Sequence, residues 1–244
     1  MTAPLDITID PFYERDLQQM ADATNYLAWQ FGMVQPHLRG RVLEVGAGIG
    51  TFTGRMAASA EHVTALEPNR YCFERLTRDT RDLSNVSRYE LSVEEFHATV
   101  ARGRLFDTIV CMNVLEHIHD DAAVLTEFRS LIAPGGRLVL LIPAIPLVFG
   151  EIDRRLGHYR RYTKRGVRTL FGGTGWRDVH LRYFNIVGLI GWLWNTKILV
   201  KHAQSDHQIR VFDRVVVPVL SRIESIVPLP VGQSLLAVGE PVIV

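Results

Sequence analysis

A short β-branched run that ends in glycines most constrains what this chain can fold into: Arg41-Val-Leu-Glu-Val45 is followed at once by Gly-Ala-Gly-Ile-Gly50. An apolar run of this length predicts a buried strand, and the glycines predict a tight turn into a helix. Such a turn leaves backbone N–H groups uncovered by Cβ atoms, so it also predicts a ligand lying across it. The alternative, in which the glycines only turn the chain, stays open here.

Strands and helices alternate beyond this turn. The hydrophobic pattern predicts helices over 11–35, 51–60, 70–81 and 121–131, and strands over 41–45, 63–66, 86–91, 106–112 and 137–142. Alternation at this spacing produces βαβ units, and therefore an α/β fold with a parallel sheet and helices on both faces.

The pattern loosens after Pro143. It predicts a polar connection over 151–162, a helix capped by Thr163, a strand over 179–184, apolar helices over 186–200 and 211–226 separated by the polar stretch 201–210, and a last strand over 234–238. No apolar segment is long enough to span hydrocarbon, so no transmembrane segment is expected.

Composition narrows the class of protein. The chain has 244 residues, 47% of them hydrophobic, and a net charge of +1, which suits one soluble α/β domain and favours neither nucleic acid nor anionic lipid as a partner. Cys72 and Cys111 stand alone, so neither a disulfide scaffold nor a zinc–cysteine site is expected. The N-terminus lacks the pattern of a secretory signal, and we expect a cytoplasmic protein.

The glycine turn and Glu67 point to an adenosine cofactor. The dinucleotide fingerprint has its third glycine one position later, where this chain has Thr51, and that departure weighs against NAD and FAD. Glu67 ends the second strand about twenty residues after the first glycine, where a carboxylate can accept hydrogen bonds from two ribose hydroxyls.

Four motifs in order resemble those of the class I S-adenosylmethionine-dependent methyltransferases. They are Val-Leu-Glu-Val-Gly-Ala-Gly-Ile-Gly (42–50), Val-Thr-Ala-Leu-Glu-Pro (63–68), Phe-Asp-Thr-Ile-Val-Cys-Met-Asn-Val-Leu-Glu-His-Ile (106–118) and Leu-Ile-Ala-Pro-Gly-Gly-Arg-Leu-Val-Leu (131–140). The resemblance implies a Rossmann-like, seven-stranded, mostly parallel sheet with an antiparallel last hairpin. The apolar residues 186–231 would then be a helical insertion between the last two strands.

The resemblance also assigns the cofactor residues. It implies that Glu44, Gly46, Ala47 and Gly48 hold the methionine end of S-adenosylmethionine, with S-adenosylhomocysteine as the product. By the same resemblance, further cofactor contacts follow the second, third and fourth strands: Glu67 and Pro68 at the ribose, Ser92 and Val93 at the adenine, and Asn113 beside the transferred methyl.

Methyl transfer to a hydroxyl needs a base beside the acceptor atom. Glu116 and His117 follow the fourth strand, and His158 follows the fifth, so we expect these three residues to be catalytic. The segment 151–170 carries seven Arg and Lys against two acids, a net +5, and within it Tyr159, Arg160, Arg161 and Tyr162 are candidate substrate-binding residues.

The segment around His158 resembles that of ubiquinone-pathway O-methyltransferases and small-RNA 2′-O-methyltransferases. In those relatives a Glu-x-x-Glu-His motif and a later His can hold a divalent metal at the acceptor oxygen. Here Asn113 takes the place of the first Glu, so the resemblance leaves both a metal-assisted reaction and a metal-free His base open.

The leading hypothesis is one methyltransferase domain over 1–244 that O-methylates a small anionic or apolar molecule. Its expected parts are an N-terminal helical cap (1–40), the cofactor core (41–143), an acceptor-side segment (144–184), the insertion (185–232) and the last strand (233–244). The alternatives are methylation of an RNA end or lipid-linked sugar, a non-catalytic cofactor-binding protein, and a nicotinamide dehydrogenase. The acceptor atom is open, as are a homodimer and a peripheral membrane contact of the apolar insertion.

Overall fold

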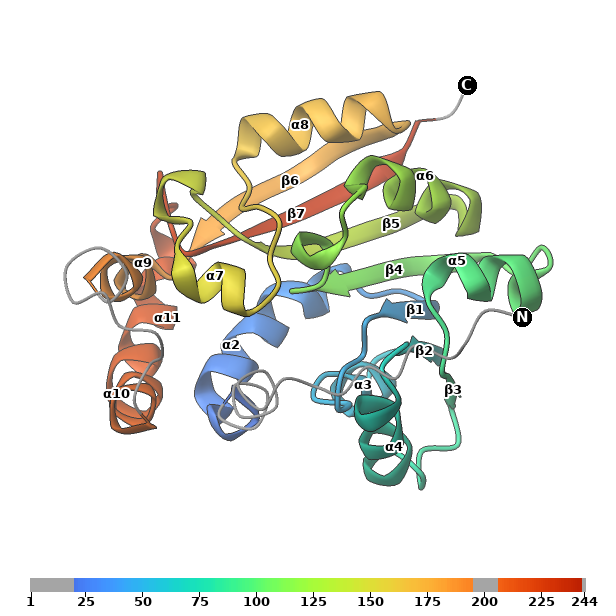
Figure 1. Ribbon diagram of the computed structural model, residues 1–244, viewed down its shortest axis with the longest axis horizontal. Coiled ribbons are helices and arrows are strands. Elements are labelled where there is room, and N and C mark those ends of the chain that lie inside the picture. Colours follow the sequence, from blue (N-terminus) through green and yellow to red (C-terminus); the bar gives the residue numbers. More distant parts are fainter. Residues whose placement is uncertain (1–19, 195–205, 243–244) are drawn as a thin grey trace.

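A seven-stranded sheet lies at the centre of the computed structural model, which describes residues 20–194 and 206–242 (Figure 1). The strand order is β3-β2-β1-β4-β5-β7-β6. The strands are β1 (Arg41–Val45), β2 (His62–Leu66), β3 (Val86–Tyr89), β4 (Phe106–Met112), β5 (Ile132–Pro143), β6 (Trp176–Phe184) and β7 (Ser234–Pro241). Neighbours from β3 to β5 are parallel, whereas β7 is antiparallel to β5 and to β6. The predicted sheet and its antiparallel last pair are confirmed.

Alternate residues of the central strands face two layers of helices. Ile109 and Cys111 of β4 belong to a core that includes side chains of α5 (Val93–Phe96), α6 (Asp121–Leu131) and α8 (Lys164–Gly173). Val110 and Met112 belong to the opposite core, with α2 (Thr24–Val34), α3 (Thr53–Ala57) and α11 (Val217–Ile226). Strands apolar on both faces are what a sheet covered on both sides requires.

A helical insertion connects β6 to β7, as predicted. It contains α9 (Ile186–Leu193), α10 (Asp206–Val211), a π-helical stretch (Phe212–Val216) and α11. Its two buried acids point inward: Asp213 accepts a hydrogen bond from the Tyr26 N–H at 2.8 Å, and Glu224 accepts from the Asn185 and Ile186 N–H groups at 2.8 and 3.0 Å. No helix among the described residues has the length and hydrophobicity needed to cross a membrane.

Several predicted helix boundaries are wrong. The helix after the glycine turn is shorter than 51–60, and α7 (Glu151–Arg155) lies within the expected polar connection. In the stretch 201–210, α10 begins at Asp206, and Ile209 packs against the core beside Val110, so tertiary burial overrides the polar local pattern. The predicted residues 11–19 and 195–205 lie outside the described part of the chain.

Helix α5 was not predicted, although its start carries a clear signal. Ser92 and Glu95 form a capping box, in which the Ser92 hydroxyl accepts from the Glu95 N–H at 3.2 Å and the Glu95 carboxylate accepts from the Ser92 N–H at 2.9 Å. The helix is only four residues long before it passes into a π-helical stretch, too short for a hydrophobic period to show.

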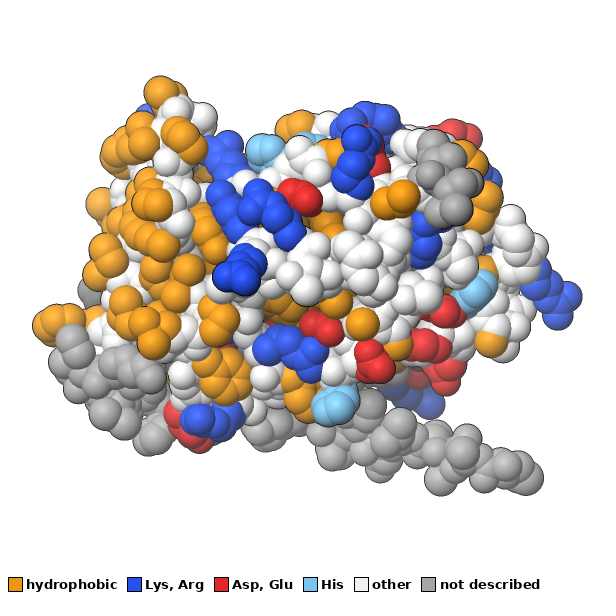
Figure 2. All heavy atoms as spheres, turned by 90° about the horizontal axis from the view of Figure 1, so that it is seen from above, with side chains coloured by type: hydrophobic (Ala, Val, Ile, Leu, Met, Phe, Trp, Pro, Cys, Tyr) orange, Lys and Arg blue, Asp and Glu red, His pale blue; other side chains and the backbone are white. Residues whose placement is uncertain are grey.

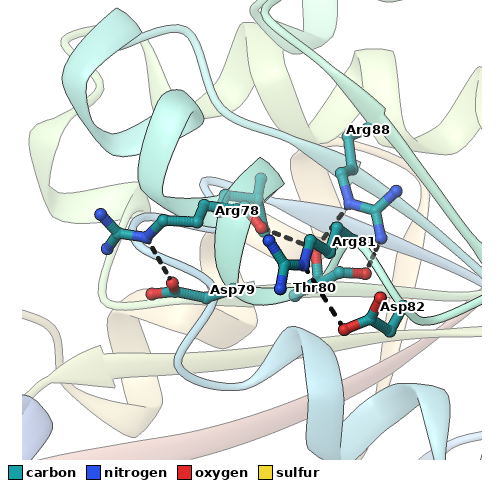
Figure 3. A network of polar contacts seen from close by, with 7 residues as sticks. Arg78, Asp79, Thr80, Arg81, Asp82 and Arg88 are labelled. Carbon is teal, nitrogen blue, oxygen red and sulfur yellow. Dashed lines mark hydrogen bonds and ion pairs between the residues drawn. The ribbon is translucent and has the colours of Figure 1, made fainter.

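The turn from α4 (Arg70–Asp79) into β3 is held by Arg88 (Figure 3). Its guanidinium donates to the Thr80 hydroxyl at 2.5 Å and to the Thr80 carbonyl, where α4 ends. A cation is favourable at a helix C-terminus because it meets the negative end of the helix dipole. Since Leu76 of α4 packs against Ala47 of the glycine turn, this network supports that turn from behind.

Candidate active site

The glycine turn after β1 forms the first half of the site. Gly46 and Gly48 both have a positive φ, +71° and +56°, a backbone conformation that residues with a Cβ atom rarely adopt. A Cβ on Gly46 would lie 2.4 Å from a Val114 methyl, whereas a Cβ on Gly48 would meet nothing within 4 Å. The turn is therefore closed by the loop after β4 at Gly46 and open to a ligand at Gly48.

Two buried carboxylates, Glu44 and Glu67, flank this turn. Glu44 accepts a hydrogen bond from the Thr53 hydroxyl at 2.7 Å, and burial, with a contribution from Glu67, raises its pKa to about 8. Glu67 accepts from the Gly48 N–H at 2.7 Å and the Asn69 N–H at 2.9 Å, and burial raises its pKa above the usual range despite these two donors. Within residues 20–194 and 206–242, no Lys, Arg or His pairs with either carboxylate. The pair is suited to an adenosine cofactor that itself carries positive charge.

The other predicted cofactor residues lie at the same edge of the sheet. Pro68 is exposed after β2, and Ser92 and Val93 follow β3, where Ser92 caps α5 and Val93 is buried. Asn113 directly follows β4, is exposed, and has a positive φ of 53° while its N–H donates to the Leu141 carbonyl at 2.7 Å. Their contacts to a cofactor remain predictions.

The three predicted catalytic residues come together beside this turn. Glu116 and His117 lie on a 3₁₀ turn (Leu115–His117) after β4, and His158 comes from the loop after α7. The rings of His117 and His158 meet edge to face with centroids 4.7 Å apart. One ligand atom from each of the three side chains lies within 4.8 Å of those of the other two.

One backbone hydrogen bond and two side-chain contacts connect the segment after β4 with the segment after α7. The Tyr159 N–H donates to the Glu116 carbonyl at 2.8 Å, and the Tyr162 hydroxyl donates to the Asp121 carboxylate at 3.0 Å. The Arg160 guanidinium also pairs with Asp121 at 2.8 Å. These contacts explain why His158 reaches residues some forty positions earlier in the chain.

Asp153 holds His158 from behind. Its Oδ1 accepts from His158 Nδ1 at 3.0 Å and from Arg161 Nε at 2.8 Å, and its Oδ2 accepts from the Gly150 N–H at 2.9 Å. Burial alone would raise the pKa of Asp153, but hydrogen bonding to His158 and the charge of Arg161 hold it below its usual range. With the proton on Nδ1, His158 presents the lone pair of Nε2 to the site.

Burial also sets the charge of the two residues on the 3₁₀ turn. It raises the pKa of Glu116 to about 7 and, together with His158, lowers the pKa of His117 to about 4. His117 is therefore a neutral imidazole near pH 7. The Glu116 Oε2 atom is buried and has no hydrogen-bond partner among the described residues.

A divalent metal fits this donor set. One carboxylate oxygen and two imidazole nitrogens are suitable ligands, and the orphaned Glu116 Oε2 is the kind of buried atom that such an ion would satisfy. Three protein ligands would leave the remaining coordination positions of such an ion to water or substrate.

The candidate substrate-binding residues divide into two pairs. Tyr159 is 55% exposed, with its ring against His119, and Arg160 is partly exposed. Arg161 and Tyr162 are buried, contrary to the expected basic surface, because Arg161 pairs with Asp153 and Tyr162 binds Asp121. This second pair therefore supports the site, and its contact with a substrate stays a prediction.

Two residues that the sequence reasoning missed complete the support. Asp153 is one of the two acids of the basic segment 151–170, and its spacing of five residues from His158 is not one at which side chains meet on a regular helix. Trp192 of α9 lies under Arg161, whose guanidinium carbon is 4.5 Å from the ring centroid. No sequence signal links Trp192 to a residue thirty-one positions earlier.

Comparison with known proteins identifies the family of this chain. A family model described as "Methyltransferase domain" matches residues 12–195. A ubiquinone biosynthesis O-methyltransferase from Xanthomonas euvesicatoria pv. vesicatoria (strain 85-10) is 33% identical over 126 residues, which cover 50% of this chain and 52% of that protein. One from Aeromonas salmonicida (strain A449) is 29% identical over 100 residues, covering 41% and 42%. The chain thus matches about half or less of the length of these curated relatives.

Solved structures share the fold. The DhpI–SAH complex matches with a TM-score of 0.59 and 17% identity over 95% of this chain and 91% of that one. The N-methyltransferase NodS from Bradyrhizobium japonicum WM9 matches with a TM-score of 0.55 and 18% identity over 96% and 99%.

Proposed function

The chain belongs to the methyltransferase-domain family, and from this premise we propose that it uses S-adenosylmethionine to methylate a hydroxyl oxygen of a small molecule, leaving S-adenosylhomocysteine. The observation that carries the proposal is the convergence of Glu116, His117 and His158 beside the open glycine turn. The O-methyltransferases among its relatives support the choice of oxygen. The cysteine usage supports a cytoplasmic reaction.

On the cofactor side, the chain supplies negative charge and backbone N–H groups. S-adenosylmethionine, when bound, supplies an electrophilic methyl group on a positively charged sulfur. Glu44 and Glu67 are buried without a cation, so a cationic ligand lowers the pKa of both and is attracted by both. The open side of Gly48 lets the ligand approach the backbone of the turn.

On the acceptor side, His158 removes the hydroxyl proton. Asp153 orients its ring and stabilises the imidazolium that forms when Nε2 takes this proton. His117 stays neutral and limits how His158 can turn, because the two rings are in contact. Tyr159 and Arg160 line the exposed side, where an apolar body or an anionic group of the acceptor can contact them.

The Glu116 Oε2 atom, which is buried without a hydrogen-bond partner among the described residues, favours a second version of this mechanism. Glu116, His117 and His158 would then hold a divalent metal that polarises the acceptor hydroxyl, and His158 would be a ligand instead of a base. The two versions predict opposite responses to a chelator.

Isothermal titration calorimetry and a methyl-transfer assay test the proposal. We expect S-adenosylmethionine to bind and NAD not to bind. Labelled methyl from S-adenosylmethionine should pass to members of a panel of small hydroxylated molecules, anionic and apolar, and not to their amine counterparts or to RNA. Binding of NAD alone would contradict the family reading, and methylation of amines or RNA alone would contradict the proposed acceptor. Activity that survives a chelator selects the His base, and activity restored by added metal selects the metal-assisted version.

A further inference from the structure

The insertion exposes an unusual amount of hydrophobic surface. The exposed hydrophobic side chains of its last helical segment are Val211, Val215, Val219, Ile223 and Ile226, and those on and next to α9 include Ile190 and Trp194. Val215 is 64% exposed and Ile226 is 83% exposed. Figure 2 shows hydrophobic side chains gathered at the end of the molecule where α9 to α11 lie in Figure 1, with Lys and Arg side chains along the border. Patches of this kind mark interaction sites.

The hydrophobic residues of the last segment follow a helical stripe. Val211, Val215, Val219 and Ile223 recur every four residues, so they share one face of the helix. Arg210, Arg214 and Arg222, all exposed, each stand one position before a member of this stripe and flank it on one side. These four hydrophobic residues, with the neighbouring Ile226 and the three arginines, form what is called the valine–arginine face.

The valine–arginine face carries charge of one sign. Among the side chains described in 186–194 and 209–231, the only acids are Asp213 and Glu224, and both are buried and bound to backbone N–H groups. An isologous contact with a second copy would bury the arginines of both copies without an exposed acid from the described part of this face to pair them. A surface that is both apolar and negatively charged matches the face better.

We propose that the valine–arginine face docks this protein on an anionic lipid bilayer. The stripe from Val211 to Ile226 enters the boundary between head groups and acyl chains, and the three arginines contact lipid phosphates. Trp194, which directly follows α9, is 54% exposed and is a residue type suited to such an interface. The inference goes beyond methyl transfer and does not depend on it.

Vesicle co-sedimentation tests this proposal with the full chain. Vesicles of phosphatidylcholine alone are compared with vesicles of equal parts phosphatidylcholine and phosphatidylglycerol. The test variants are Val219→Asp/Ile223→Asp and Arg210→Gln/Arg214→Gln/Arg222→Gln. The matched control, Arg70→Gln/Arg78→Gln/Arg81→Gln, removes the same charge from exposed positions on and next to α4. Binding of S-adenosylmethionine, measured by calorimetry, verifies that each variant is folded.

The wild type and the α4 control should sediment with the anionic vesicles and not with the neutral ones. Loss of the three arginines of the face should weaken binding roughly a hundredfold at low salt. The double aspartate variant should not sediment. The proposal is overturned if the wild type does not sediment with anionic vesicles. It is equally overturned if the α4 control loses as much binding as the variant without the three arginines of the face. It is also overturned if analytical ultracentrifugation finds a dimer that the double aspartate variant dissociates.

Discussion

The two halves of the candidate site both contain buried carboxylates, but they balance the charge differently. In the cofactor half, the hydrogen-bond donors to Glu44 and Glu67 from the described part of the chain are all neutral, and burial raises the pKa of each carboxyl group. In the acceptor half, Asp153 contacts both His158 and Arg161, and its pKa is held low. A buried carboxylate without a positively charged partner favours the binding of a cationic ligand, whereas one that is paired with a cation holds its neighbours in place.

This difference in charge balance indicates which residues should control the binding of S-adenosylmethionine and which should control turnover. Changes in the cofactor half should alter affinity for S-adenosylmethionine, with an effect on stability that is small and depends on pH. Changes in the acceptor half should alter turnover or stability and leave cofactor affinity unchanged. Four substitutions test this division, ordered by the size of the expected effect.

Loss of the His158 imidazole should have the largest effect. His158→Ala removes the base, or a metal ligand, and should lower kcat by about a hundredfold to ten-thousandfold. The Kd for S-adenosylmethionine, measured by calorimetry, should not change. His62→Ala is the matched control, because His62 binds Ser87 on the far strands. Full turnover by His158→Ala would show that His158 is neither the base nor a required metal ligand.

Asp153→Asn should both destabilise the protein and slow it. The substitution leaves the buried Arg161 charge without its partner, which costs about 3–5 kcal/mol in the free energy of unfolding measured by urea denaturation. In Asp153→Asn/Arg161→Met, the buried charge is gone, so stability should recover at least in part. Turnover should stay low, because His158 is no longer oriented. Recovery of both properties together would show that Asp153 only stabilises the fold.

Glu67→Gln should weaken cofactor binding about tenfold to a hundredfold, the effect of removing a charged hydrogen-bond acceptor. The acceptor half is untouched, so kcat at saturating S-adenosylmethionine should change little. Glu61→Gln, at an exposed position before β2, serves as the control. A fall in kcat with unchanged affinity for S-adenosylmethionine would show that Glu67 acts in the acceptor half and not in the cofactor half.

Glu44→Gln should have the smallest effect and a distinctive pH dependence. The pKa of Glu44 rises from 4.5 in the unfolded chain to about 8 in the folded one, so its contribution to stability is present below pH 4.5 and lost as the pH rises through 8. The variant should therefore gain a few degrees in Tm relative to wild type above pH 8 and not below pH 4.5. A Tm difference that does not depend on pH would contradict the raised pKa.

The same residue should couple cofactor binding to proton release. Wild-type affinity for S-adenosylmethionine should increase as the pH rises toward 8, because a cationic ligand favours ionised Glu44. Calorimetry in two buffers of different ionisation enthalpy should detect the released proton in the wild type and a smaller release in Glu44→Gln.

Much of the fold could be predicted because its signals are local. The glycine turn after β1, the strand at 106–112 and the cap at Thr163 each depend on residues adjacent in the chain. The misses have the opposite character. Helix α10 begins within a polar stretch because Ile209 finds a distant core, and α5 is too short to show a period.

The candidate site divides in the same way. Sequence motifs predict Glu44, Glu67 and the neighbourhood of His117 and His158, since each lies at or beyond the carboxyl end of a strand, and these ends share one edge of the sheet. They could not reveal that Arg161 is buried instead of exposed. Its environment is made by Asp153, by the Ala144 carbonyl and by Trp192 from a separate helix.

The sequence by itself determined the order of strands and helices, the glycine turn and the chemical types of the site residues, because periodicity and turn chemistry act over a few residues. Only the tertiary structure decided which charges are balanced and which hydrophobic residues remain exposed. Burial and pairing depend on segments that are distant in the chain and meet only in the fold. The net charge of +1 therefore includes three regions that differ in charge. The cofactor half contains two buried acids, the charges of the acceptor half are paired with one another, and the apolar face of the insertion is bordered by exposed arginines.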